Sequence, residues 1–211
     1  MTAMGKIEAN KKQKREALFN AAFELFTTRG IAKTTINDIV QSSGVAKGTF
    51  YLYFKDKYDI RNKLISHKAS RIFYAADAAL KTSGITDFTE KILFLTNHII
   101  DQFVGDKSLL NFVSKNLSWG IFKNELISAN NDYDIDFYNI YTVFENSPQK
   151  FKNPEVLLFM IVELVSSTCF SSILYNEPVE IEELKPYLFD AIRQLIQSQK
   201  ILSTELIKRA N

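Results

Sequence analysis

The sequence predicts an all-α fold, and three observations lead to this prediction. Apolar residues recur three and four positions apart along most of the chain, which is the spacing of one face of a helix. Residue types that begin and end helices stand at the borders of these segments. No segment alternates polar and apolar residues as a β-strand does. The 211 residues suffice for one compact body or for a small module joined to a larger one.

The composition excludes several classes of protein. With 46% apolar residues and only 7 Gly and 4 Pro, the chain is neither disordered nor fibrous. Its single cysteine, Cys169, cannot form an internal disulfide, and His67 and His98 are too far apart in the sequence to indicate a metal-ligand pair. The acidic segment 130–136 lacks the glycine and the closing glutamate of an EF-hand. We therefore expect no metal and no cofactor.

Two segments bear on the location of the protein. The first thirty residues contain six Lys/Arg and no apolar run long enough for a signal peptide. The segment from Val156 to Tyr175 is apolar, but Glu163 lies at its middle, where a carboxylate in a bilayer is costly. We interpret this segment as a buried helix and not as a membrane span. The sequence therefore predicts a cytoplasmic protein without a membrane partner.

The net charge of +2 conceals an uneven distribution. Residues 1–75 carry 14 Lys/Arg and 6 Asp/Glu, whereas residues 76–211 carry 12 and 18. A basic N-terminal part is typical of a module that meets a polyanion, because Lys and Arg neutralise phosphate groups. A solvated Lys-rich tail explains residues 6–15 equally well, but it does not explain the lysines that follow residue 45.

The first predicted helix covers residues 12–29, and Gly30 ends it. One face of this helix is apolar, and it is formed by Leu18, Ala22, Leu25 and Phe26. The preceding residues 1–12 are expected to form a flexible basic tail.

Two short helices are predicted next, around a glycine turn. Thr35 stands three residues before Asp38, a variant of the capping box that begins a helix. Gly44 supplies the left-handed conformation that ends this helix. The next helix is predicted at residues 47–54. Two short helices joined by a tight turn indicate a helix-turn-helix.

A longer helix follows, with Asp56 as its cap and Gly84 at its end. The predicted domains are a helix-turn-helix domain at residues 13–58, a linker helix at 59–82 and a larger helical domain at 83–211.

In a helix-turn-helix, the second short helix lies in the major groove of DNA. Phe50 and Phe54 fall on one face of this helix, which leaves the other side chains for DNA. Lys47 is suited to donate to guanine or to a phosphate, and Tyr51 is suited to pack on a thymine methyl or to donate to a phosphate. Gly48 has no side chain and allows close approach of the backbone.

The other candidates are phosphate contacts. Thr49 and Tyr53 offer hydroxyl groups, while Thr35 and Lys57 stand at helix N-termini, where an anion is favoured. Each residue has an alternative role when taken singly: packing for the tyrosines, relief of a helix contact for Gly48, and an ordinary surface position for Lys57. Their combination in one short segment favours DNA binding.

These residues resemble a known family. The run Lys47-Gly48-Thr49-Phe50-Tyr51-Leu52-Tyr53-Phe54, with Lys57 three residues later, resembles the TetR family of bacterial transcriptional repressors over about residues 13–60. The resemblance implies an all-helical dimer, with a three-helix DNA-binding domain and a larger C-terminal domain that binds an effector and the second subunit. The DNA contacts that it implies are Lys47, Gly48, Thr49 and Tyr51 in the groove, Thr35, Tyr53 and Lys57 on phosphates, and Asn37 at a base.

One residue departs from the family pattern. Ala46 stands where relatives often have Ser or Thr, and it has no side-chain oxygen to cap the third helix. Packing or DNA itself must then hold the first turn of that helix.

Capping signals also mark helices in the C-terminal part. Asp87, Asn153 and Pro186 each stand at the start of an apolar periodic segment. The last two helices, about 154–175 and 186–198, are apolar over more than one face, as expected if each also packs against a second copy. The family resemblance implies that they form the homodimer interface. The alternative is a pair of fully internal core helices.

Large aromatic side chains are frequent in this part of the chain, and a cavity lined by them for an apolar or aromatic effector is a natural hypothesis. The candidate pocket residues are Phe94, Phe103, Trp119, Phe122, Tyr138, Tyr141 and Phe170. A plain aromatic core is the alternative, because aromatic residues at helical spacing usually pack in the interior.

The leading hypothesis is a ligand-responsive transcriptional repressor that binds a palindromic operator as a homodimer, with its recognition helices about 34 Å apart. A small effector would release the DNA by binding another conformation better. The alternative is a DNA-bound adaptor that recruits a protein and has no small-molecule effector. An enzyme is not expected, because the sequence has no phosphate-binding glycine loop, nucleophile motif or catalytic cluster.

Overall fold

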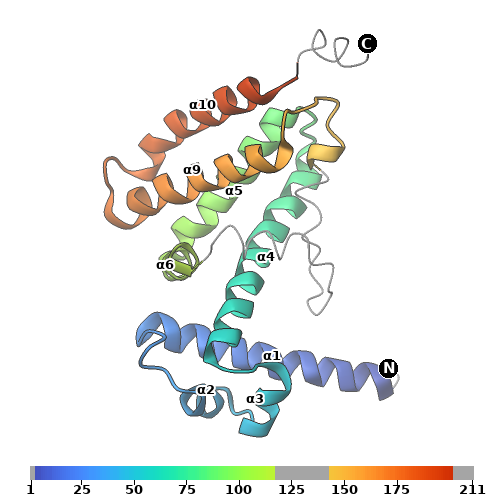
Figure 1. Cartoon of the computed structure of the whole chain (residues 1–211), viewed down its shortest axis with the longest axis vertical. Helices are drawn as coiled ribbons and strands as arrows, with labels where there is room; N and C mark the ends of the chain where they lie inside the picture. Colours follow the sequence, from blue (N-terminus) through green and yellow to red (C-terminus); the bar gives the residue numbers. More distant parts are fainter. Residues whose placement is uncertain (1–2, 117–142, 202–211) are drawn as a thin grey trace. The chain divides into compact units, whose positions relative to one another are not determined.

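The computed structural model describes residues 3–116 and 143–201, and within these ranges it contains eight labelled helices, a short helical segment at residues 143–145 and no strand (Figure 1). The chain divides into two compact units, Met1–Lys68 and Ala69–Asn211. The helices are α1 (Ala3–Thr28), α2 (Ile36–Ser43), α3 (Lys47–Tyr53), α4 (Lys57–Ser83), α5 (Phe88–Gly105), α6 (Lys107–Asn116), α9 (Pro154–Tyr175) and α10 (Ile181–Gln199). The predicted all-α fold is confirmed.

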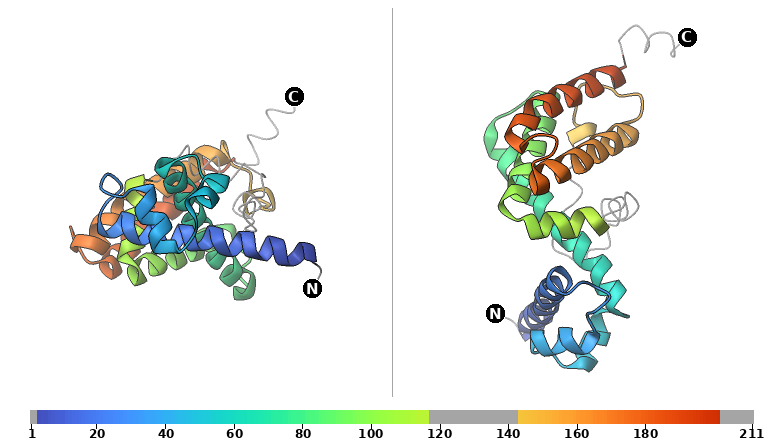
Figure 2. Two further views of the ribbon diagram at one scale, coloured as in Figure 1. Left: turned by 90° about the horizontal axis from the view of Figure 1, so that it is seen from below. Right: turned by 90° about the vertical axis from the view of Figure 1, so that its left-hand side faces the viewer.

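The N-terminal unit consists of α1, α2, α3 and the first turns of α4, which lie together in the right-hand view of Figure 2. Its centre is aromatic: the Phe54 ring lies 5.4 Å from the rings of both Phe19 and Phe50. The aliphatic side chains of Leu18, Ile60 and other residues on the inner faces of these helices are also buried. The apolar face predicted for the first helix therefore forms part of a true core.

Helix α1 begins earlier than the sequence predicted. Residues 3–12, expected as a flexible tail, are helical, although the side chains from Gly5 to Lys14 are exposed. The Ala, Lys, Glu and Gln residues in this stretch have high helix propensity. The buried part of α1 supplies the helical nucleus, so adding further turns costs little.

The predicted boundaries of α2 are confirmed. The Thr35 side chain accepts from the Asp38 amide, and an Asp38 carboxylate oxygen accepts from the Thr35 amide at 2.8 Å, which completes the capping box. Gly44 ends the helix with φ of 66°, a left-handed conformation that a side chain would strain. Ala46 provides no side-chain cap to α3, as predicted.

Helix α4 also begins and ends at the predicted signals. Asp56 accepts from the amides of Tyr58 (2.7 Å) and Asp59 (2.9 Å), and Gly84 follows the last turn with φ of 73°. Residues of this one helix belong to both units.

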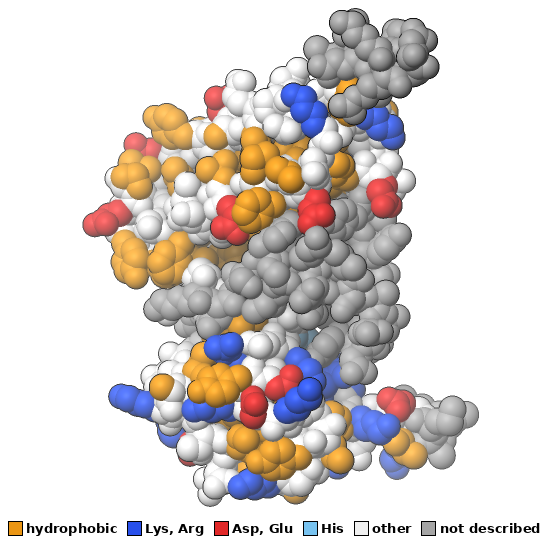
Figure 3. Space-filling view, viewed as in Figure 1, with side chains coloured by type: hydrophobic (Ala, Val, Ile, Leu, Met, Phe, Trp, Pro, Cys, Tyr) orange, Lys and Arg blue, Asp and Glu red, His pale blue; other side chains and the backbone are white. Residues whose placement is uncertain are grey.

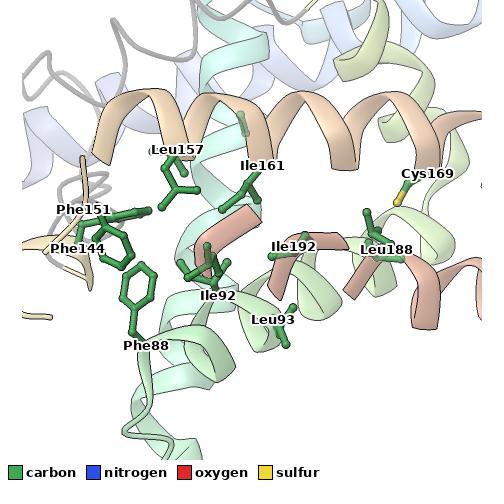
Figure 4. Close-up of a cluster of buried hydrophobic side chains, with 14 of the residues drawn as sticks. Phe88, Ile92, Leu93, Phe144, Phe151, Leu157, Ile161, Cys169, Leu188 and Ile192 are labelled. Carbon is green, nitrogen blue, oxygen red and sulfur yellow. The ribbon is translucent and has the colours of Figure 1, made fainter. Parts of the chain in front are cut away.

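The C-terminal unit is built around a second core, shown in Figure 4. Most of its side chains come from α5, α9, α10 and the segment before α9. They include Ile92, Leu157, Ile192 and the rings of Phe88, Phe144 and Phe151, which contact one another in tilted and edge-to-face arrangements. Asp87 and Asn153 cap α5 and α9 as predicted. These caps place the apolar faces of the two helices toward the same core.

Helix α6 was not predicted. Asp106 directly follows α5 and caps the next helix, because its side chain accepts from the Leu109 amide at 2.9 Å. Leu110 and Phe112 then become buried. One aspartate therefore serves the end of one helix and the start of the next.

Helix α10 begins five residues before the predicted start. Pro186, expected at the first helical position, lies inside the helix, which begins at Ile181 after Glu180. Glu182 and Glu183 stand in the first turn, where the helix dipole favours carboxylates. Packing of Leu188 and Ile192 into the core offsets the amide hydrogen bond that the proline cannot make.

Within the described ranges, one helix, α9, is long and apolar enough to cross a membrane. About a third of its most apolar window is buried in the protein. The buried side chains include Leu157, Ile161 and Cys169, and burial raises the pKa of the Cys169 thiol to about 11, so this thiol stays neutral at pH 7. These contacts agree with the interpretation of the segment as a core helix.

We predict that two substitutions in α3 differ sharply in their effect on stability. Phe50 is fully buried and Leu52 is 79% exposed. Phe50→Ala should lower the free energy of unfolding by about 3–5 kcal/mol because it leaves a cavity. Leu52→Ala, the control, should change it by no more than about 0.5 kcal/mol. Urea denaturation followed by circular dichroism measures both, and equal losses would contradict the assigned faces of α3.

Candidate nucleic-acid interface

Helix α3 presents one exposed face. Phe50 is buried against the core, and the backbone amide of Phe54 closes the helix by donating to the Phe50 carbonyl at 3.0 Å. Successive side chains on a helix are about 100° apart, so the residues opposite these two rings point outward. The outward-facing residues are Lys47, Gly48, Tyr51 and Leu52. We call these four residues the groove face.

Gly48 is not required by the packing of the protein. A Cβ atom built on Gly48 would meet no heavy atom within 4 Å. The alternative that this glycine relieves a helix contact therefore has no support in the structure. The missing side chain at Gly48 leaves the helix backbone open to a molecule outside the chain. This agrees with the predicted role of Gly48 in the close approach of the backbone to a duplex.

Thr49 and Tyr53 lie at the borders of the groove face. Both side chains are half-buried, and the Tyr53 ring lies 6.2 Å from the Phe54 ring. They thus combine packing with a partly exposed position. Their predicted role as phosphate contacts stays a prediction, as does that of exposed Asn37 in the first turn of α2.

The Thr35 hydroxyl is already used within the domain. It donates to an Asp38 carboxylate oxygen at 2.7 Å and accepts from the Asp38 amide. The hydrogen bonds from the Thr35 side chain and backbone, together with the positive charge of Arg29, hold the pKa of Asp38 below its usual value. Thr35 therefore positions α2, and its hydroxyl proton is not available to the phosphate for which the sequence suggested it.

Lys57 also differs from its predicted role. Its ammonium group donates to the backbone carbonyls of Ile31 (2.9 Å), Ala32 (3.2 Å) and Thr34 (3.1 Å). An ammonium group has three N–H donors, so these contacts account for all of them. The segment between α1 and α2 is not helical, and its carbonyl groups need donors from elsewhere. Lys57 thus forms a clamp between α4 and this segment, and these contacts do not support its predicted role at a phosphate.

A second lysine of α4 fixes the end of α3. Lys63 donates to the Tyr53 carbonyl at 3.0 Å and lies 3.5 Å from the Asp59 carboxylate. Asp59 in turn accepts from the Lys55 amide at 2.8 Å. These contacts satisfy a carbonyl at the C-terminus of α3, where a positive charge is favourable. The first turns of α4 therefore set the position of the groove helix.

Other basic side chains of the N-terminal unit also reach its surface. Lys33 and Lys55 are exposed, and the Arg61 guanidinium lies 5.6 Å from the centre of the exposed Tyr58 ring. Figure 3 shows Lys and Arg side chains gathered over the N-terminal unit. A surface of this charge attracts a polyanion such as DNA.

The predicted effector residues are only partly described. Trp119, Phe122, Tyr138 and Tyr141 lie outside the residues that the structure describes. Phe94 packs beside the small cluster of Ala76, Leu80 and Leu95, whereas Phe103 and Phe170 lie at the edge of the larger core. The structure therefore does not bring these three rings into one cluster.

The described part of the C-terminal unit contains an open pocket of about 370 Å³. It is lined by Leu80, Lys81, Gly84, Ile85, Thr86, Lys91, Val143 and Asn146. None of the predicted effector residues lines it, so the pocket does not support that prediction.

Sequence reasoning missed two features of the interface. It did not single out Leu52 as a groove-facing residue, although Leu52 is four positions after Gly48 and therefore shares its face. It also missed the contact of Lys63 with Tyr53, ten residues away, for which the sequence offers no local signal.

Comparison with known proteins agrees with this geometry. Residues 18–64 match the family model described as bacterial regulatory proteins, tetR family. The HTH-type transcriptional regulator YvdT of Bacillus subtilis (strain 168) is 40% identical over 63 residues, covering 28% of this chain and 32% of that protein. The fatty acid metabolism regulator protein of the same organism is 28% identical over 99 residues, covering 47% and 50%. The chain thus matches a third to a half of the length of these relatives.

A solved structure extends the similarity to most of the chain. A TetR family transcription regulator from Marinobacter aquaeolei VT8 covers 90% of this chain and 98% of its own, with a TM-score of 0.62 and 14% identity. At this identity the similarity shows a shared fold. It confirms the predicted architecture of a helix-turn-helix domain followed by a larger helical domain.

We predict that Lys57→Met destabilises the N-terminal unit without removing a phosphate contact. The variant keeps an apolar side chain of similar length but loses three donors, and we expect a loss of about 1–3 kcal/mol in the free energy of unfolding. The salt dependence of DNA binding should keep its slope. Lys55→Met is the control, because Lys55 is exposed and should leave stability unchanged. A slope reduced by about one unit at unchanged stability would instead assign Lys57 to a phosphate.

Proposed function

Since this chain is a TetR-family regulatory protein, with the DNA-binding domain of that family at residues 18–64, we propose that it is a transcriptional repressor. It binds a palindromic operator as a homodimer and is released by a small apolar or aromatic effector. The observation that carries the proposal is the groove face of α3, which is exposed, carries Lys47 and is held in place by buried side chains on its other side.

The groove face supports DNA binding by its chemistry. Lys47 offers a charged donor to guanine O6 and N7 or to a phosphate. Tyr51, 52% exposed, offers a ring edge and a hydroxyl group. Gly48 lets the backbone approach base edges. Helix α3 has only seven residues and depends on the core for its orientation, so it acts as a rigid reader of the groove.

The proposed dimer interface is formed by α9 and α10, about residues 154–175 and 186–198. On α9, Val156 (44% exposed) and Phe159 (37% exposed) lie three positions apart on the outer face. Figure 3 shows apolar side chains at the surface of the C-terminal unit. These two apolar side chains lie on the outside of a core helix, where they are suited to packing against the same residues of a second copy, and exposed Glu163 follows them on this face.

The proposed effector is apolar, and two arguments support it. The chain is rich in aromatic residues after Gly84. One similar protein is a fatty acid metabolism regulator. A repressor that meets DNA and a metabolite of this kind works in the cytoplasm, which is where we propose that this protein acts.

The proposal is tested by selecting duplexes from a random library with the full-length protein and measuring the affinity of the selected sequence at several salt concentrations. We predict a palindromic sequence and a slope that reports several released counterions. Lys47→Gln should weaken binding and reduce the slope by about one unit per subunit if the ammonium group meets a phosphate, or change the selected base if it meets guanine. Lys150→Gln, the matched removal of an exposed charge in the C-terminal unit, should change neither. Failure to select any duplex would reject the proposal.

We predict separately that Phe159→Glu disrupts the dimer. A carboxylate in an apolar interface is buried without a partner, which disfavours association strongly. Sedimentation should show a shift toward monomer, and affinity for the full palindrome should fall toward that for a half-site. Ser108→Glu adds the same charge at an exposed position of α6, outside the two proposed interface helices, and is the control. Unchanged sedimentation of the Phe159 variant would place the interface elsewhere.

A further inference from the structure

Leu52 is unusual among the apolar residues of this protein. Its side chain is 79% exposed, more than any other large apolar side chain whose exposure the structure describes. Single exposed apolar residues on a protein surface need no explanation. Leu52, however, belongs to the groove face, on a helix whose phenylalanine, Phe50, is buried in the core.

The position of Leu52 on α3 gives its side chain a defined direction. Side chains on a helix lean toward its N-terminus, so Leu52 leans toward the turn that contains Gly48, four residues earlier. Gly48 contributes no side chain, and the space above it is open. The isobutyl group of Leu52 therefore lies beside a stretch of helix backbone that no side chain covers at Gly48. Lys47 and Tyr51 lie on the same exposed face.

A leucine side chain can distinguish bases only by apolar contact. It has no donor or acceptor, so it cannot distinguish the hydrogen-bonding groups of the major groove. Thymine is the only base that presents a methyl group there, at C5. An apolar side chain that removes this methyl group from water gains free energy at thymine and nothing equivalent at the other bases.

We propose that Leu52 is a specificity-determining residue that contacts the C5-methyl group of a thymine in each half of the operator. The inference rests on the proposed function and adds to it the chemistry of one base position. Lys47 and Tyr51 supply the charged and polar contacts beside it, while the absence of a side chain at Gly48 lets Leu52 come within contact distance of the methyl group.

The experiment replaces each thymine of the selected operator, one symmetric pair at a time, by deoxyuridine. This change removes only the methyl group and keeps the base pair. At one pair of positions, the wild-type protein should lose about fourfold in affinity per half-site, or about 16-fold for both, which is the effect expected for one buried methyl group. At the other thymines the loss should be smaller.

Three variants assign the effect to Leu52. Leu52→Ala should bind thymine and deoxyuridine operators equally at this position, with an unchanged salt slope and unchanged stability. Leu52→Met keeps an apolar side chain of similar volume and should restore most of the discrimination. Tyr51→Phe should retain it fully. Because Leu52 is exposed, none of its substitutions is expected to impair folding.

The outcomes separate this inference from the proposed function. A wild-type protein that binds its operator tightly but ignores every deoxyuridine replacement overturns the inference and leaves the function intact. Persistence of discrimination in Leu52→Ala also overturns it and assigns the methyl group to another side chain. If Leu52→Ala instead abolishes self-association of the free protein, Leu52 belongs to a contact between copies, and the inference is overturned. Absence of any duplex binding rejects both proposals.

Discussion

The structure of the interface depends on the burial of two rings, Phe50 and Phe54, beneath a helix of seven residues. A helix of this length is not stable alone in water, because nucleation consumes more conformational entropy than its few hydrogen bonds return. Ala46 gives no side-chain cap that would help. The aromatic contacts with Phe19 therefore supply both the existence and the direction of α3. Every property of the groove face follows from which side of α3 these rings occupy.

Four lysines around α3 fall into two groups according to what their ammonium groups contact. Those whose ammonium groups reach main-chain carbonyls, Lys57 and Lys63, fix the elements that surround α3. Those that remain exposed, such as Lys47 and Lys55, carry positive charge toward solvent. A count of charged residues in the sequence does not distinguish these two groups of lysines. Only the fold distinguishes a lysine that builds the site from one that is available to a phosphate.

The sequence predicted the features that arise within a few residues. The caps at Thr35, Asp87 and Asn153 and the glycine end of α2 are hydrogen bonds or dihedral requirements between near neighbours, so residue types at fixed spacing reveal them. The early start of α10 was not predictable in this way, because burial of distant side chains outweighs the local preference of Pro186. The clamp formed by Lys57 and the exposure of Leu52 were also not predicted, since the contact of Lys57 with Thr34 spans more than twenty residues and the exposure of Leu52 is set by packing.

The ammonium group of Lys57 donates to main-chain carbonyl oxygens and not to side chains. Every amino acid carries the same carbonyl group, so the clamp does not depend on which side chains occupy positions 31 and 32. The clamp itself therefore places no requirement on the type of side chain at those positions. Position 57, by contrast, requires the ammonium group. An uncharged residue there would leave the carbonyl groups of Ile31, Ala32 and Thr34 without this donor.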